Sequence, residues 1–85
     1  MESKYKVVLH RNAAKNLKKI PHPWKQRIIE AIEILEEDAF YGVKLWGDLK
    51  NCRKIRIWPY RIIYTIKIKE KLVYILNIDH RQNIY

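Results

Sequence analysis

Polar and apolar residues alternate along the last third of this 85-residue sequence, which is the pattern of β-strands. The strand-like runs are Arg53 to Trp58, Tyr60 to Ile68 and Leu72 to His80. A polar turn at residues 69–71 joins the last two runs, so they are predicted to form a β-hairpin. Pro59 separates the first two runs, where its missing N–H does least harm to strand pairing.

Two helices are predicted before these strands. The first begins at Asn12, a favourable N-cap residue, and is expected to end before Pro21. The second carries a continuous apolar stripe at helical spacing, formed by Trp24, Ile28, Ala31, Ile32 and Leu35. A short β-branched and aromatic run, Tyr5 to Leu9, predicts a strand ahead of both helices.

These elements occur in the order β-α-α-β-β-β within a single domain, residues 1–85. We therefore predict an α+β fold, an antiparallel sheet with the N-terminal helical hairpin packed on one face. In the linker from about Ala39 to Lys50, three apolar residues are expected to anchor the loop against the core: Leu45, Trp46 and Leu49. The other face of the sheet is left open for function.

Eighteen Lys and Arg residues against nine Asp and Glu residues give the chain a formal net charge of +9. Five of the acids gather in the middle of the chain: Glu30, Glu33, Glu36, Glu37 and Asp38. Both flanking regions are therefore strongly basic, which favours a polyanionic partner, either nucleic acid or an acidic protein segment. Charge alone does not distinguish between these two.

Cysteine and histidine usage bounds the kinds of site that are expected. The single cysteine, Cys52, rules out an intrachain disulfide, and with three scattered histidines it offers no metal-ligand spacing. We therefore expect no metal ion and no cofactor. The sequence also lacks the apolar stretch of a signal peptide and the roughly 18 apolar residues of a membrane span, so a cytoplasmic protein without membrane contact is expected.

Basic and aromatic residues gather on the predicted strands. Strand periodicity places Lys54, Arg56 and Trp58 on one face of their strand, and Arg61 lies on the neighbouring strand. Trp58 either packs at the strand end, which is the simpler explanation, or stacks on a base. One face of the last strand and its continuation carries Asn77, Asp79 and Arg81. The cations converge on one patch if the strand register is favourable, which the sequence does not fix.

Metal-free RNA cleavage requires a base for the ribose 2′-hydroxyl, cations for the phosphate and an acid for the departing 5′-oxygen. Arginine stays protonated, so phosphate binding is the expected role of Arg56, Arg61 and Arg81. Lys54 and Tyr85 are the candidates for proton transfer, and His80 is a third.

Several of these candidates also have an ordinary structural explanation. Lys54 and Arg56 fit a solvated strand face, and Arg61 fits an edge arginine paired with Asp79. His80 alternates with apolar residues, so a packed, hydrogen-bonded histidine is a better explanation for it than catalysis.

Two motifs are the most specific part of the sequence: Tyr60-Arg61-Ile62-Ile63-Tyr64 and the closing His80-Arg81-Gln82-Asn83-Ile84-Tyr85. Shorter matching segments are Ile34-Leu35-Glu36-Glu37, Gly42-Val43-Lys44-Leu45, Leu49-Lys50 and Lys54-Ile55-Arg56. Through these segments nearly the whole chain resembles the RelE/ParE superfamily of toxins from type II toxin–antitoxin pairs, and especially its RelE-like mRNA endonucleases.

The resemblance implies a ribosome-dependent endonuclease that cuts mRNA in the ribosomal A site without a metal ion. It also implies neutralisation by an acidic, RelB-like antitoxin. The catalytic residues that it implies are Lys54, Arg56, Arg61, Arg81 and Tyr85. Arg56 is a departure from a pair of possible bases, because arginine cannot act as one, which leaves Lys54 for that role. We also expect no helix after Tyr85, unlike in some relatives.

Two other functions fit the same fold. One is a ParE-like toxin that binds DNA gyrase and has no nuclease activity, and the other is a basic RNA-binding module. A toxin that acts only by binding protein has no need of the basic and tyrosine set described above. That set therefore favours the nuclease.

Overall fold

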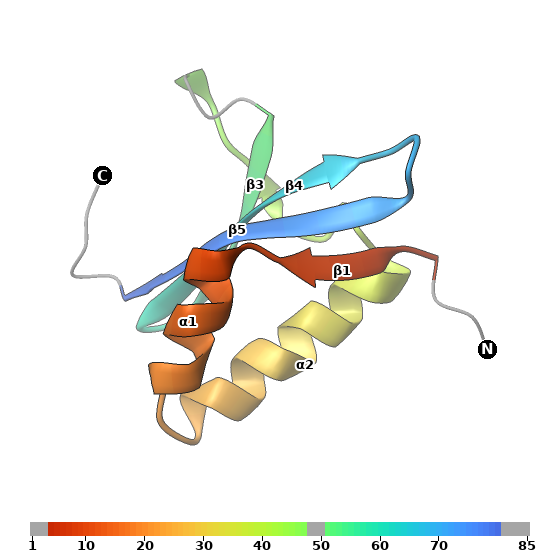
Figure 1. Cartoon of the computed structure of the whole chain (residues 1–85). Helices are drawn as coiled ribbons and strands as arrows, with labels where there is room; N and C mark the ends of the chain where they lie inside the picture. Colours follow the sequence, from red (N-terminus) through yellow and green to blue (C-terminus); the bar gives the residue numbers. More distant parts are fainter. Residues whose placement is uncertain (1–3, 48–50, 81–85) are drawn as a thin grey trace.

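The structure is a computed structural model that describes residues 4–47 and 51–80. Its elements are β1 (Lys6–Leu9), α1 (Arg11–Lys19), α2 (Trp24–Glu37), β2 (Val43–Lys44), β3 (Cys52–Ile57), β4 (Tyr60–Lys67) and β5 (Leu72–His80). Both helices lie on one side of the sheet (Figure 1), so the predicted α+β fold and element order are confirmed. The short strand β2, within the linker, is an addition to the prediction.

The helical hairpin begins two residues earlier than its sequence indicates. His10, not Asn12, is the N-cap of α1, because its Nδ1 atom accepts a hydrogen bond from the Asn12 backbone N–H at 3.1 Å. Asn12 therefore lies inside the first turn, and the predicted cap was wrong. The helix ends where expected, since Lys19 is its last residue and Pro21 lies two positions beyond it.

The sheet has the strand order β1-β5-β4-β3-β2. The three long strands are antiparallel neighbours, as predicted, and the last two form the expected hairpin. β1 instead lies parallel to β5, so the sheet is mixed. Strands joined by a hairpin must run antiparallel, but β1 and β5 are separated by most of the chain and carry no such constraint.

A register shift interrupts the pairing of β4 with β5. Ile63 lies opposite Asn77 but Tyr64 lies opposite Ile75, which leaves Leu76 without a partner in β4. This bulge reverses the alternation of β5. Ile75 and Ile78, three positions apart, are therefore both buried.

The core lies between the helical hairpin and one face of the sheet. Its completely buried side chains come from both layers and include Ala13, Ile28, Leu35, Ile62, Tyr64, Val73 and Ile75. Trp24 packs against this core, as predicted. Trp46 does not, because 80% of its surface is exposed, so the prediction that it anchors the linker was wrong.

Tyr64 anchors the linker instead. Its buried hydroxyl group donates a hydrogen bond to the Ala39 carbonyl at 2.9 Å and accepts one from the Gly42 N–H at 2.8 Å. A Cβ atom on Gly42 would lie 2.6 Å from the Tyr64 hydroxyl oxygen and 2.8 Å from the Lys54 carbonyl oxygen. Only glycine allows so close an approach. One phenol group therefore fixes the path of the chain between α2 and β2.

Replacing Tyr64 by phenylalanine should lower the free energy of unfolding by about 1–3 kcal/mol, because the Gly42 N–H loses its partner in a buried position. Urea denaturation followed by circular dichroism measures the change. Tyr41→Phe is the matched control, since Tyr41 is exposed and should tolerate the loss of its hydroxyl group. Equal stability of the wild-type chain and Tyr64→Phe would show that the hydroxyl group does not hold the linker.

The raised pKa of Tyr64 also predicts that the wild-type chain and Tyr64→Phe differ in stability at alkaline pH. Burial raises the pKa of Tyr64 above its ordinary value of 10.0, although the Gly42 hydrogen bond and the Arg53 charge oppose the rise. The folded protein thus keeps a proton that the unfolded chain loses, and this stability is lost as pH rises from about 10 through the folded-state pKa. The unfolding free energy of the wild-type chain should fall more steeply in this range than that of Tyr64→Phe.

Candidate functional site

The strand register brings the predicted charged residues into one row. Arg56 of β3 lies directly opposite Arg61 of β4, and Arg61 lies opposite Asp79 of β5. Lys54, two positions before Arg56, shares its face of β3 and pairs with Ile63. Arg61 alternates with buried Ile62, so this face is the one turned away from the helices. The convergence that the sequence left open is therefore present for these three cations.

Two hollows in the surface share Arg56. Lys54 and Arg56 line one of them together with Val43 of β2, whose exposed side chain makes its wall apolar. Arg56 and Arg61 line the other, together with Trp58 and Tyr60. We refer to the surface formed by Lys54, Arg56, Trp58 and Arg61 as the cationic cleft. It offers three positive charges, one of them on a lysine that can exchange a proton, beside an aromatic ring.

Trp58 lies beside Arg56 and Arg61, as strand periodicity predicts, but the strand-end packing that the sequence favoured for it is wrong. It stands between β3 and β4 with 61% of its surface exposed, so it does not serve as strand-end packing. Its ring borders the cleft with Arg56 and Arg61, where a flat base is able to stack. The sequence signal was strand alternation, which places Trp58 on the same face as Lys54 and Arg56.

Asp79 is the one charged residue among the buried residues that the structure describes, with 7% of its surface exposed. Burial raises the pKa of its carboxyl group, and the charge of Arg61 and a hydrogen bond from the Asn77 amide at 2.9 Å oppose that rise. Asn77 is itself held by Asn16 of α1 at 3.0 Å. Asp79 thus brings a negative charge to one end of the row of cations.

The remaining predicted residues are not part of the cleft as described. Arg81 and Tyr85 lie outside the described residues, so their assigned roles stay predictions. His80 is half-buried, and its ring meets that of Tyr60 edge-on at 5.2 Å. It follows Asp79 on the strand and takes the opposite face, away from Arg61. Its position agrees with the packed histidine that the sequence favoured over a catalytic one.

The described part of the chain holds neither a cluster of metal-ligand residues nor a membrane-spanning helix. Residues 4–47 and 51–80 contain no group of three or more His, Cys, Asp or Glu side chains arranged to hold a metal ion. Neither of the helices described is long and apolar enough to cross a membrane.

Residues 7–85 match the family described as the ParE toxin of the type II toxin–antitoxin system parDE. Because the match extends over nearly the whole sequence, the chain belongs to this family of toxins. The resemblance to the RelE/ParE superfamily is thereby confirmed, and the chain is a toxin of the type II toxin–antitoxin class. No curated protein matches the sequence in a direct comparison.

Solved structures of RelE toxins have the same fold. The RelBE2 toxin–antitoxin complex of Mycobacterium tuberculosis contains a chain with a TM-score of 0.83 and 28% identity, over 92% of this chain and 99% of that one. The RelE–RelB complex of Pyrococcus horikoshii contains a chain with a TM-score of 0.77 and 27% identity, over 95% of this chain and 99% of that one. The isolated RelE toxin of Escherichia coli has a TM-score of 0.75 and 22% identity, over 89% of this chain and 83% of that one. At this identity the similarity supports the fold alone.

The charge of Asp79 gives a prediction about the cleft. Asp79→Asn should bind a short single-stranded RNA about two- to fivefold more tightly, because the loss of one negative charge beside Arg61 is expected to contribute up to about 1 kcal/mol. The fold should persist, since burial already disfavours the charged form of this carboxyl group. Fluorescence anisotropy measures the affinity.

Glu70→Gln is the control for net charge, because it makes the same change in the exposed turn between β4 and β5. An equal gain in affinity in both variants would mean that Asp79 acts only through the total charge of the protein. No gain in Asp79→Asn would show that its carboxylate does not oppose the cations of the cleft.

Proposed function

We propose that this toxin is a ribosome-dependent endoribonuclease that cuts mRNA in the ribosomal A site and so inhibits translation. The observation that carries the proposal is the cross-strand pairing of Arg56 with Arg61, with Lys54 on the same face and Trp58 at the edge of the same cleft. A surface of this kind grips a phosphate through arginine, holds a base against an aromatic ring and includes a group able to accept a proton.

In the proposed reaction the ribose 2′-oxygen attacks the adjacent phosphorus atom and the bond to the 5′-oxygen breaks. Lys54, in its neutral form, takes the proton from the 2′-hydroxyl group. Arg56 and Arg61 stabilise the additional negative charge on the phosphate. From the family resemblance, Arg81 adds to this charge stabilisation and Tyr85 gives a proton to the departing 5′-oxygen. The products are a 2′,3′-cyclic phosphate and a 5′-hydroxyl group.

The proposed partners follow from the class of protein. A toxin of a type II system is paired with an antitoxin, and the net charge of +9 suits an acidic, RelB-like one. The same charge suits mRNA on the ribosome. Action on ribosomes places the active toxin in the cytoplasm.

A gyrase poison is the second candidate, and one observation favours it: the matching family is named for ParE toxins. Such a toxin binds DNA gyrase and cuts no RNA. The fold is the same in both cases, so the cleft must decide. Arg56 and Arg61 stand side by side despite their mutual repulsion, which a phosphate relieves and a protein-binding toxin does not require. We therefore favour the nuclease over the gyrase poison and over a non-cleaving RNA-binding module.

Primer extension on mRNA from cells expressing the chain tests the proposal. Cuts in phase with codons are expected, whereas a gyrase poison would instead block DNA replication and leave mRNA intact. Purified toxin should also cut mRNA on preformed ribosomal complexes after a chelator is added, with ribosome integrity checked by sedimentation. A strict magnesium requirement at the cleavage step itself would rule out the metal-free mechanism.

Two substitutions test the residue roles. Arg61→Ala and Tyr85→Phe should each slow single-turnover cleavage by about 10²-fold or more, if one stabilises the charge and the other transfers a proton. Lys67→Ala is the control, because Lys67 is an exposed lysine at the far end of β4. Rates within about twofold of the wild-type rate for both test variants would return Arg61 and Tyr85 to structural roles.

A further inference from the structure

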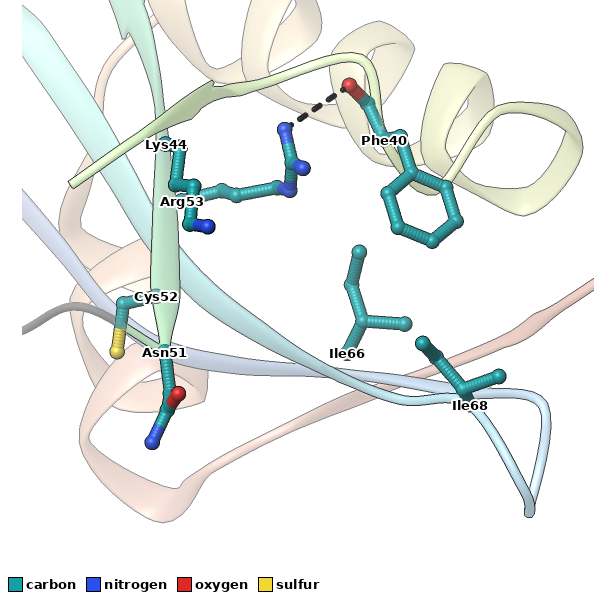
Figure 2. Close-up of a pocket in the computed structure, with 7 residues that line it drawn as sticks. All are labelled: Phe40, Lys44, Asn51, Cys52, Arg53, Ile66 and Ile68. Carbon is teal, nitrogen blue, oxygen red and sulfur yellow. Dashed lines mark hydrogen bonds between the residues drawn. The ribbon is translucent and has the colours of Figure 1, made fainter.

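A separate hollow lies on the side of the sheet that carries the helices, where α2 ends. We call it the linker groove and define it by Phe40, Lys44, Arg53, Ile66 and Ile68. Figure 2 shows Arg53 reaching from β3 toward Phe40, with the two isoleucines of the β4 end below them. The groove therefore combines apolar walls with two cations.

Two backbone carbonyls and an aromatic ring hold Arg53 in the groove. Its Nη1 atom donates to the Gly42 carbonyl at 2.8 Å and to the Phe40 carbonyl at 3.4 Å, and its guanidinium group lies 5.0 Å from the centre of the Phe40 ring. A guanidinium group has five N–H donors, so others remain for an incoming anion. Lys44 lies directly opposite Arg53 in the pairing of β2 with β3, which adds a second positive charge.

Exposed apolar side chains concentrate around this groove. Phe40 is 48% exposed and Ile68 is 61% exposed. Trp46, which is 80% exposed, adds a third, because the centre of its ring lies 5.8 Å from the Nζ atom of Lys44 in the groove. Single exposed apolar residues are ordinary on a protein surface, but several beside the same two cations indicate a binding surface.

The chemistry of the groove favours a protein segment over RNA. Ile66 and Ile68 have no flat face on which a base could stack. The Phe40 ring does, but the guanidinium group of Arg53 already lies over it. A peptide that carries carboxylates among aliphatic or aromatic side chains satisfies both the cations and the apolar walls.

We propose that the linker groove binds an acidic, apolar segment of the antitoxin. The proposal rests on the assignment of the chain as a type II toxin, and it adds to the proposed function the surface that the antitoxin recognises. This surface is separate from the cationic cleft. Arg53 pairs with buried Tyr64 and lies on the helix side of the sheet, whereas Lys54, the next residue, lies on the open side.

The test measures antitoxin binding directly. The probe is the cognate antitoxin, co-expressed with the toxin, separated from it in denaturant and titrated into refolded toxin by calorimetry. Ile68→Glu should weaken binding at least tenfold, because it places a carboxylate on an apolar wall that meets an acidic segment. Ile34→Glu, the same change at a 41% exposed position on α2 outside the groove, should stay within about twofold of the wild-type affinity. Wild-type affinity in Ile68→Glu, or equal losses in both variants, would overturn the proposal.

Charge reversal provides a second arm. Lys44→Glu should weaken antitoxin binding more than Lys67→Glu, which makes the same change in charge on β4 outside the groove. The same variants are titrated with a short single-stranded RNA. If Ile68→Glu and Lys44→Glu lose RNA affinity and keep antitoxin affinity, the groove is an RNA contact and the proposal is wrong.

The outcome is independent of catalysis. Antitoxin binding is measured without cleavage, so a chain that cuts no RNA still tests the groove. Conversely, codon-phased cleavage together with unchanged antitoxin binding by Ile68→Glu would support the proposed nuclease and contradict only the proposed role of the groove.

Discussion

The hydrogen bonds of the Tyr64 hydroxyl group fix the linker to the sheet, and both surfaces of this toxin depend on them. The hydroxyl group donates a hydrogen bond to the Ala39 carbonyl and accepts one from the Gly42 N–H. These two bonds hold the linker to one path across the end of the sheet. On that path Val43 becomes a wall of the cationic cleft and Phe40 becomes a wall of the linker groove. A small domain buries few polar groups, and in this toxin the buried Tyr64 hydroxyl group positions a loop.

The cleft shows how a small sheet can gather like charges. Arg56 and Arg61 face each other across two strands, an arrangement that is unfavourable when nothing lies between them. Asp79 offsets part of the repulsion from the third strand. A buried carboxylate next to an arginine stabilises the empty cleft, while the exposed end of the row at Arg56 keeps its full attraction for a phosphate. The fold thus tolerates a cationic site without giving up its charge.

Local patterns predicted most of the fold. Alternation placed β3, β4 and β5 nearly to the residue, and an apolar stripe placed α2. The parallel pairing of β1 was missed because it depends on a contact between distant segments. The His10 cap is local, but Asn12 is the more usual N-cap residue, and Trp46 was expected to be buried only because it is apolar. For the site, strand alternation correctly grouped Lys54 with Arg56. The sequence also suggested Asp79 as a partner of Arg61, but the bulge that sets the two opposite each other is marked by no local pattern.

The position of the linker limits which substitutions the toxin can accept during evolution. It contributes to two surfaces on opposite sides of the sheet, and Gly42 within it accepts no larger residue. If the two surfaces have the roles proposed for them, a substitution that reshapes the groove also moves a wall of the cleft. Antitoxin recognition and activity would then be inherited together through the few residues of the linker.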